Sequence, residues 1–309
     1  MPDSASVLIC TARKEPRLIQ TLECLKNQSF KNFELIYIDA LKPQREPEFL
    51  ETIKSYEQHY PIVHIQDRPR PKLGEFPGIC NARNSGIIMA NGDAILMVGD
   101  HTYLPENWIT RHMFAYSKGF NSTGPCWMLK TSDELYKYKT GTLEKHPEEN
   151  KIFVKFGETK YESPYDCRLP GIPDEYIFSN KIIFTNCGGG WMHSLNLQMS
   201  LERLLNINGF SEEFDKAGWG FEDCHLGARM QMMGFPQIFD VGNWMLQIDD
   251  KLNTRMITGS VNPEDRDNFD KYGAVNSKLY DDFLQKGYPI WSNPEINLRK
   301  MREVLRIKS

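Results

Sequence analysis

The sequence predicts an α/β fold in which helices flank a mostly parallel sheet. Over the first hundred residues, short apolar runs alternate with longer segments whose apolar residues recur at helical spacing. This alternation is typical of β-α-β units and of a parallel sheet. With 309 residues, of which 40% are hydrophobic and 25% charged, the chain is long enough for one large globular domain or a core domain with an appendage.

Four strands and three helices are expected before residue 100. The strands have the sequences SVLICTA, FELIYID, PIVHIQ and AILMVG, and the helices between them RLIQTLECLKNQ, EPEFLETIKSYEQHY and GICNARNSGIIMANG. Asp39 ends the second strand, and Asp100 and His101 follow the fourth. Because ligands bind beyond the carboxyl ends of parallel strands, these side chains are expected at one functional edge of the sheet.

The second half of the chain is less regular. From about residue 130 to 180 it is polar, aromatic and proline-containing, and such an excursion forms either a binding surface or a peripheral hairpin without a special role. The run KIIFTNCGGGWMHS predicts a strand that enters a glycine turn, and GFSEEFDKAGWGFEDCHLGARM predicts a turn followed by a helix. Two further helices, SKLYDDFLQKG and EINLRKMREVLRIKS, are expected after residue 245.

Composition and charge narrow the class of protein. A net charge of −4 gives no overall attraction to nucleic acid, and the seven cysteines show no CxxC pair, which favours free thiols in a reducing compartment. The start MPDSASVLIC lacks the basic region of a signal peptide, and no apolar run approaches the roughly 20 residues that span a bilayer. We therefore expect a soluble, cytoplasmic protein.

Four segments, in order along the chain, carry family motifs. They are SVLICTARKEPRLIQTLECLKNQSFKNFELIYID, CNARNSGIIMANGDAILMVGD, VGDHTYLPENW and GFSEEFDKAGWGFEDCHLGARM. In turn they resemble the opening strand-helix-strand, the A-R-N-x-G helix, the D-x-D turn and the G-W-G-x-E-D helix start of glycosyltransferase family 2. The resemblance implies the Rossmann-like GT-A fold over residues 1–245, with an acceptor-side excursion at about 130–180. It leaves a partly helical C-terminal extension over residues 246–309.

The resemblance implies an inverting glycosyltransferase that moves a sugar from a UDP- or GDP-sugar to an acceptor hydroxyl. By family position Asp223 would be the general base, and Glu222 would hold a donor or acceptor hydroxyl. Trp191 and Trp219 would offer apolar surfaces to the acceptor. The alternative for the acidic pair is a simple helix N-cap, which explains one carboxylate but not the G-W-G before it.

The donor-binding residues are also implied by the resemblance. Asp39 resembles the carboxylate that binds the nucleotide base, although a strand-end turn aspartate is the simpler alternative. Thr11 and Arg13 would lie beside it. Arg83 and Asn84, from the A-R-N segment, would reach the diphosphate or orient a metal-binding carboxylate. Three further cations either face the diphosphate or belong to a solvated loop: Arg68, Arg70 and Lys72.

A divalent cofactor, Mn²⁺ or Mg²⁺, is implied with an altered ligand set. Gly99 and His101 stand where the family has its two outer aspartates, and Asp100 stands between them. Imidazole can replace a carboxylate as a ligand, whereas glycine supplies nothing. His101 is therefore the first expected ligand and Asp100 the second; a weakly held ion and a metal-independent enzyme are the alternatives. His193 and His225 are candidate third ligands, or structural histidines.

Two other functions are alternatives to sugar transfer. The lost aspartate at Gly99 would suit a non-catalytic nucleotide-sugar binding protein or scaffold. A sugar nucleotidyltransferase would need a G-x-G-x-R turn, which CTARKEPRL lacks. The acceptor stays open among polysaccharide, lipid-linked glycan, protein and a modified nucleic acid base, the last disfavoured by the net charge.

The C-terminal segment EINLRKMREVLRIKS combines an apolar stripe with cations. The stripe comprises Ile296, Met301, Val304 and Leu305, and the cations are Arg299, Lys300, Arg302, Arg306 and Lys308. A basic amphipathic helix can lie on an anionic membrane, which would give peripheral membrane contact. The alternative is a helix that packs its stripe on the domain.

Overall fold

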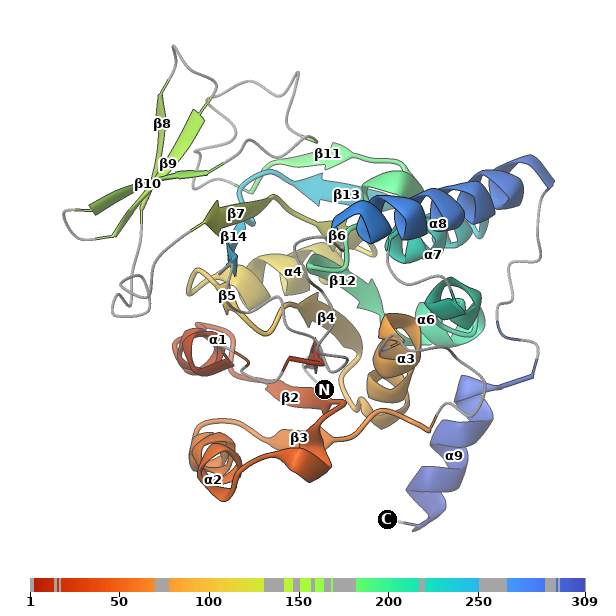
Figure 1. Cartoon of the computed structure of the whole chain (residues 1–309), viewed down its shortest axis with the longest axis horizontal. Coiled ribbons are helices and arrows are strands. Elements are labelled where there is room, and N and C mark those ends of the chain that lie inside the picture. Colours follow the sequence, from red (N-terminus) through yellow and green to blue (C-terminus); the bar gives the residue numbers. More distant parts are fainter. Residues whose placement is uncertain are drawn as a thin grey trace.

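The computed structural model describes residues 3–13, 16, 18–69, 78–130, 142–146, 151–156, 159–163, 168, 182–216, 220–249, 266–286, 293 and 295–308. At its centre lies an eight-stranded sheet with helices on both faces (Figure 1). The strand order is β11-β13-β6-β12-β4-β1-β2-β3. The predicted α/β fold with a mostly parallel sheet is confirmed.

The strands expected before residue 100 form one half of this sheet. They are β1 (Ala5–Thr11), β2 (Phe33–Asp39), β3 (Ile62–Ile65) and β4 (Ala94–Val98). They pair in parallel in the order β4-β1-β2-β3, and Thr11 at the end of β1 is the register partner of Asp39. Their carboxyl ends therefore meet at one edge, as the sequence predicts.

Strand directions are mixed in the other half. Its strands are β6 (Asn121–Thr123), β11 (Phe184–Asn186), β12 (Asn196–Ser200) and β13 (Gln237–Asp240). β12 runs antiparallel to both β4 and β6, while β13 runs parallel to β6 and antiparallel to β11. β12 thus brings the chain that follows the glycine run back beside the parallel half.

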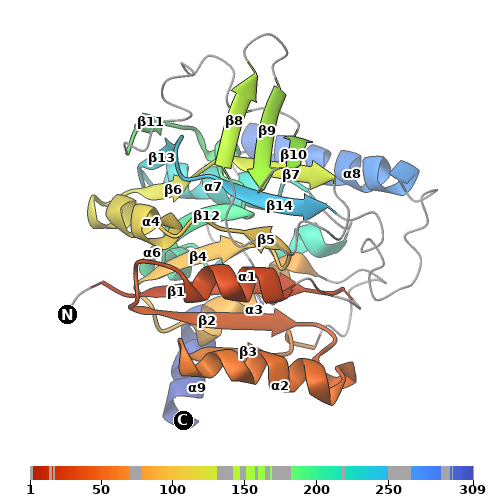
Figure 2. The ribbon, with the colours of Figure 1, turned by 90° about the vertical axis from the view of Figure 1, so that its left-hand side faces the viewer.

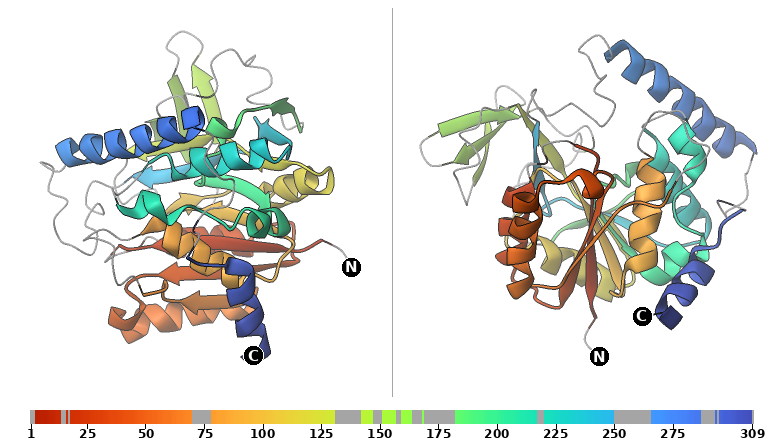
Figure 3. Two further views of the ribbon diagram at one scale, coloured as in Figure 1. Left: turned by 90° about the vertical axis from the view of Figure 1, so that its right-hand side faces the viewer. Right: turned by 60° about the horizontal axis from the view of Figure 1, so that its bottom comes forward.

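Two helical layers cover the sheet (Figure 3). One contains α1 (Leu18–Lys26), α2 (Pro47–Ser55) and α4 (Trp108–Ser117), and the other contains α3 (Ile79–Met89), α6 (Leu201–Asn206) and α7 (Glu222–Met232). Side chains of a strand alternate between the two faces, so Val7 and Ile9 of β1 join the first layer's core and Leu8 joins the second. Short 3-10 helices are η1 (Lys42–Gln44), η2 (Tyr56–Gln58), η4 (Gly189–Trp191) and η5 (Glu212–Lys216).

Helix α3 is fixed on the sheet by close packing and by a distant cap. A Cβ at Gly86 would lie 2.8 Å from side-chain carbons of both Ile38 and Leu8, so glycine allows the helix to approach β1 and β2 this closely. The residue before the helix supplies no side-chain cap. Instead Asp215 accepts hydrogen bonds from the backbone N–H of Cys80 and of Asn81, both at 2.9 Å.

Two small sheets accompany the central one. In the first, β14 (Met245–Asp249) lies between β5 (Thr102–Tyr103) and β7 (Cys126–Lys130). Since β14 pairs with both, the predicted domain boundary after residue 245 falls at the first residue of a strand of this sheet. The second sheet lies within the excursion and beside β7 (Figure 2). It consists of β8 (Thr142–His146), β9 (Lys151–Phe156) and β10 (Thr159–Ser163).

The two helices expected near the C-terminus are present. α8 (Arg266–Lys286) lies along α7, where the Phe283 ring meets that of His225 with centroids 4.4 Å apart. α9 (Leu298–Lys308) packs on α3: Leu298 is fully buried, and Arg302 donates to the carbonyl oxygen of Ile88 at 3.1 Å. No helix in the described ranges has the length and apolar character needed to cross a bilayer.

Candidate active site

A cavity of about 420 Å³ opens at the carboxyl-terminal edge of the parallel strands. Its walls come from the ends of β1 and β4 and from the starts of α3 and α7. The structure brings together here seven of the predicted site residues: Thr11, Arg13, Arg83, Asp100, His101, Glu222 and Asp223. Segments separated by more than two hundred positions in the sequence therefore share one site.

The acidic pair starts α7 after a left-handed turn. Gly220 has φ 103° and Phe221 has φ 65°, a conformation that side-chain-bearing residues rarely adopt. Glu222 accepts hydrogen bonds from the backbone N–H of Gly220 at 3.0 Å and from Nη1 of Arg83 at 2.9 Å. Burial and the neighbouring Asp223 carboxylate raise the pKa of Glu222, while Arg83 acts in the opposite direction. Glu222 is thus ion-paired with Arg83.

Asp223 has neutral partners instead. One carboxylate oxygen accepts from the backbone N–H and the hydroxyl of Ser194, at 3.1 and 3.2 Å, and the other accepts from the backbone N–H of Cys224 at 2.9 Å. Asp223 is half-buried and lines the cavity. Ser194 was not predicted from the sequence; it lies 29 positions away, after the glycine run. Its hydroxyl holds the carboxylate in place without neutralising it.

On the opposite wall, Asp100 is the centre of a hydrogen-bonded cluster. Its oxygens accept from the Thr11 hydroxyl, from Nε of Arg13 at 3.3 Å and from Nδ1 of His101 at 2.7 Å. Burial on its own would raise the pKa of Asp100, but the hydrogen bonds from His101 and Thr11 and the charge of Arg13 lower it to about 2. Asp100 is therefore ionised at neutral pH and accepts hydrogen bonds only.

The second ring nitrogen of His101 faces β14. Nε2 of His101 lies 2.7 Å from the amide nitrogen of Gln247, another cavity residue that was not predicted. The amide oxygen of Gln247 is buried and has no hydrogen-bond partner among the described residues. The register of β14 on β5, which pairs Gln247 with Thr102, places this side chain next to the turn.

This wall offers a divalent cation few protein ligands. The described residues contain no group of three or more His, Cys, Asp or Glu side chains that could hold a metal ion. What they offer is the Nε2 atom of His101, the orphaned amide oxygen of Gln247 and the charge of Asp100. Nitrogen and oxygen donors of this kind fit Mn²⁺ or Mg²⁺, with less negative charge at the ion than two carboxylates would provide.

Asp39 lies at the predicted edge but does not line the cavity. Its fully buried carboxylate is held by Nε and Nη2 of Arg45, both at 2.8 Å, by the backbone N–H of Leu41 at 3.0 Å and by His64 at 3.3 Å. Burial raises and these partners lower the pKa of Asp39, with a net decrease. A base contact through Asp39 requires that Arg45 release one of its oxygens.

Two other predicted residues are turned away from the cavity. The side chain of Asn84 is fully buried and bonds to the backbone of Phe210 and to Glu212, so it holds a loop. The Trp191 ring packs edge-on against Phe239 with centroids 5.6 Å apart. Direct donor or acceptor contact by these two is therefore not supported by their positions. Trp219, Arg70 and Lys72 lie outside the described residues.

The candidate third metal ligands also lie elsewhere. Burial lowers the pKa of His225 to about 2, and its ring is enclosed by Phe214 and Phe283, with centroids 4.9 and 4.4 Å away. His225 and His193 do not line the cavity. Arg68 donates to Ser85 and Glu212 and does not line this cavity.

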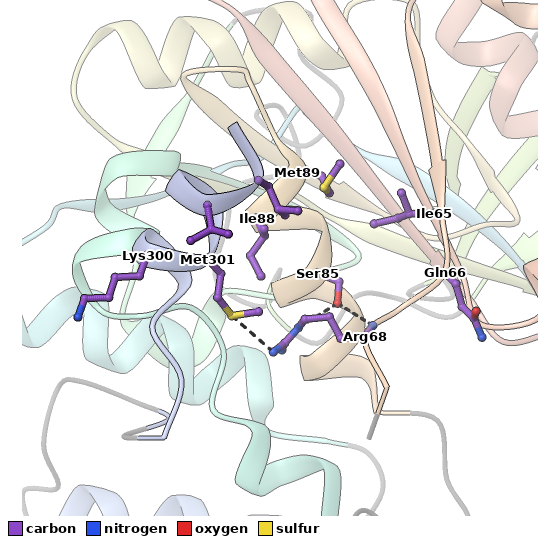
Figure 4. A pocket seen from close by; sticks show the side chains of 10 residues that line it. Ile65, Gln66, Arg68, Ser85, Ile88, Met89, Lys300 and Met301 are labelled. Atoms are coloured by element: carbon purple, nitrogen blue, oxygen red, sulfur yellow. Dashed lines mark hydrogen bonds between the residues drawn. The ribbon is translucent and has the colours of Figure 1, made fainter. Parts of the chain in front are cut away.

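A second, apolar cavity of about 500 Å³ lies between the end of β3, α3 and α9 (Figure 4). The labelled Met301, Ile88 and Met89 point toward it, and Arg68 lies at its rim within 4.0 Å of the Met301 sulfur. Val304 and Leu305, which also line it, stay 51% and 43% exposed. Half of the predicted apolar stripe therefore packs on the domain, and half faces solvent.

The chain was compared with known proteins. Validoxylamine A glucosyltransferase from Streptomyces hygroscopicus subsp. limoneus is 22% identical over 251 residues, which are 78% of this chain and 51% of that protein. The chain thus spans about half the length of this curated relative.

Two solved structures share the fold. GalNAc-T7, solved with UDP, GalNAc and Mn²⁺, aligns with a TM-score of 0.56 and 13% identity over 98% of this chain and 54% of its own. TarS of S. aureus, residues 1–349, aligns with a TM-score of 0.51 and 12% identity over 79% of this chain and 60% of its own. These likenesses confirm the predicted GT-A fold.

The family assignment rests on the sequence motifs and on a family model. The model for glycosyl transferase family 2 matches residues 6–167, more than half of the 309 residues. This range contains the first three of the four motif segments, including the turn with Asp100 and His101. The chain belongs to glycosyl transferase family 2.

Proposed function

We propose that this protein transfers a sugar from a UDP- or GDP-sugar to an acceptor hydroxyl with inversion at the anomeric carbon. Asp223 takes the hydroxyl proton while the acceptor oxygen bonds to the anomeric carbon, and the bond to the nucleoside diphosphate breaks. One observation carries the proposal: the half-buried Asp223 carboxylate, held by neutral donors, shares a cavity with the cations Arg13 and Arg83.

The two adjacent carboxylates have different tasks in this proposal. Glu222 is bonded to Arg83 and serves to position that guanidinium near the diphosphate. Asp223 has no ion-pair partner among the described residues and lies at the first turn of α7. A carboxylate that lines the cavity without an ion pair can accept a proton, whereas Glu222 cannot do so without breaking its ion pair.

The donor binds, in this proposal, against the ends of β1 and β4. Thr11 and Arg13 lie on that wall, and Arg83 faces them from α3. Asp39 contacts the nucleotide base after Arg45 releases one oxygen. Such a rearrangement exchanges one hydrogen-bonded partner of a buried carboxylate for another, so no oxygen is left unsatisfied.

A divalent cation, Mn²⁺ or Mg²⁺, completes the donor site in this proposal, with His101 as its first protein contact and Asp100 beside it. When bound, such a cation neutralises charge that develops on the diphosphate. The distantly similar GalNAc-T7 structure contains UDP and Mn²⁺, and these two are therefore the first probes to use.

The experiment is hydrolysis and transfer assays across UDP- and GDP-sugars with Mn²⁺, on wild type and Asp223→Asn. General base catalysis is worth about 10²- to 10⁴-fold, so turnover should fall by that factor while UDP affinity is retained. Turnover of the variant within about threefold of wild type would reject Asp223 as the base. Nucleotide binding without any turnover of wild type would instead favour the non-catalytic binding protein.

We propose in addition that the exposed end of α9 contacts an anionic membrane. The support is the apolar pair Val304 and Leu305, beside the cavity of Figure 4 and next to the exposed Lys300. Removing the whole helix would take the buried Leu298 from the core, so Val304→Ser/Leu305→Ser is the sharper variant. Wild type should co-sediment with phosphatidylglycerol vesicles more than the variant does, and equal sedimentation of both contradicts the proposal.

A further inference from the structure

Gln247 is half-buried, and its amide oxygen is in an unusual hydrogen-bonding state. Its nitrogen is 2.7 Å from Nε2 of His101, whereas its oxygen is buried with no partner among the described residues. A buried acceptor without a donor costs free energy and is uncommon in native proteins. This oxygen belongs to a residue that lines the active-site cavity.

The protonation of His101 follows from its two neighbours. An Asp100 oxygen lies 2.7 Å from Nδ1 of His101 and also accepts a hydrogen bond from Nε of Arg13, so Nδ1 is the ring nitrogen that donates. The amide nitrogen of Gln247 can only donate, so Nε2 accepts with its lone pair. Asp100 thus orients the His101 ring so that the lone pair of Nε2 is directed at Gln247. Carboxylates orient metal-ligating histidines in the same way.

Asp100 in turn is held by residues of the first loop. Thr11 and Arg13 bond to its two oxygens, so the carboxylate is engaged on both. Oδ2 of Asp100 accepts one hydrogen bond, from Thr11, and Oδ1 accepts two, from Arg13 and His101, so most of its lone pairs are already used. The unsatisfied oxygen of this wall belongs to Gln247, on a neighbouring strand.

We infer that Gln247 is the second protein ligand of the divalent cation, and that Asp100 is a positioning residue that holds His101 in its ligating tautomer. This inference rests on the cation in the proposed function. Rotation of the Gln247 side chain about the bond to its amide group exchanges the amide nitrogen and oxygen. The oxygen then faces a cation that is bound to Nε2 of His101. Amide oxygens are suitable ligands for Mn²⁺ and Mg²⁺.

Direct Mn²⁺ binding, followed by electron paramagnetic resonance with and without UDP, tests the ligand role. Gln247→Leu should bind Mn²⁺ about tenfold more weakly, and Gln247→Glu, which adds a charged oxygen at the same place, should bind it more tightly than wild type. Gln237→Leu is the matched control. Gln237 is buried, and its amide oxygen likewise has no partner among the described residues, but it lies on β13 and does not line the cavity.

The outcomes separate this inference from the proposed function. Gln247→Leu binding within about twofold of a wild type that does bind Mn²⁺ overturns the ligand role alone. A loss of binding in Gln237→Leu equal to that in Gln247→Leu overturns it as well, because the effect would then follow from lost core packing. A wild type that does not bind Mn²⁺ even with UDP overturns both this inference and the cation in the proposed function.

Nitrogen NMR of the His101 ring tests the positioning role independently of activity. In wild type without metal, Nδ1 should carry the proton and Nε2 should not. Asp100→Ala should shift the proton to Nε2, whereas Asp100→Asn, which keeps an acceptor oxygen, should preserve the wild-type tautomer. A proton on Nε2 in wild type, or an unchanged tautomer in Asp100→Ala, overturns the role assigned to Asp100.

Discussion

Asp39 and Asp100 come at the ends of the two strands that flank β1, and both are buried carboxylates beside an arginine and a histidine. Their surroundings differ. The partners of Asp39 are Arg45, Leu41 and His64, and none of them lines the cavity. Thr11, Arg13 and His101, which bond to Asp100, line it themselves.

A carboxylate at the end of a strand belongs to the candidate active site only if its hydrogen-bond partners also line the cavity. Position at the carboxyl edge of a sheet is common to both residues. The difference lies in whether the groups that satisfy the carboxylate also face the cavity. Arg45 closes over Asp39 with a two-point contact, whereas Asp100 is joined to residues that a ligand can reach.

The largest effect is expected for Asp39→Ala. It leaves the Arg45 guanidinium, 6% exposed, without its carboxylate, so the free energy of unfolding should fall by about 3–5 kcal/mol, measured by urea denaturation. If Asp39 also contacts the base, UDP affinity should fall too. Arg45→Ala is the matched variant: it destabilises as well but frees Asp39, and UDP affinity should be kept. Unchanged UDP affinity in both variants would make Asp39 purely structural.

For Asp100, a smaller effect with a defined pH dependence is expected. Because its pKa is lowered to about 2, the ionised form stabilises the folded state above the unfolded pKa near 4, and this stabilisation is lost as pH falls toward 2. Asp100→Asn should therefore cost about 2 kcal/mol at pH 7 and almost nothing at pH 2. A difference between wild type and variant that does not shrink in acid would contradict this assignment.

A carboxylate at position 99 would test whether the turn can bind a cation more tightly. The backbone of Gly99 is not left-handed, and an added Cβ would lie 3.0 Å from the Thr102 hydroxyl oxygen, which has no partner among the described residues. Gly99→Asp therefore needs only a small shift of that hydroxyl. It should tighten Mn²⁺ binding about tenfold, measured calorimetrically with UDP present. Gly99→Asn, without the charge, is the control, and equal affinities in both variants would argue against a carboxylate contact.

The smallest effect is expected for Ser194→Ala, which changes the cavity-lining partner of a third carboxylate, Asp223. Ser194→Ala removes the hydroxyl bond at 3.2 Å but keeps the backbone one at 3.1 Å. Turnover should fall about fivefold, equivalent to about 1 kcal/mol, with KM little changed. Ser194→Thr retains a hydroxyl and should recover part of the loss. A change in KM alone would place Ser194 in substrate binding instead.

The parallel half of the fold and its functional edge could be predicted because strand periodicity and motif order are local signals. Arg83 and Asn84 show the limit of such signals: adjacent positions on a helix point about 100° apart, so one faces the cavity and the other a loop. Gln247 is 146 positions from His101, and only the pairing of β14 with β5 brings it there. The ion pair of Arg45 with Asp39 could not be predicted from the sequence, because an arginine in a polar turn is usually exposed to solvent.

The cap that Asp215 places on α3 has a consequence for protein engineering. The segment that carries Asp215 and Glu222 is tied to α3 at Cys80, Asn81 and Arg83. The α3 wall and the α7 wall of the cavity are therefore one exchangeable block rather than two. A chimaera that takes the start of α7 from another family member without the matching α3 should lose the hydrogen bonds that hold the two helices together. A chimaera that takes both helices should keep them.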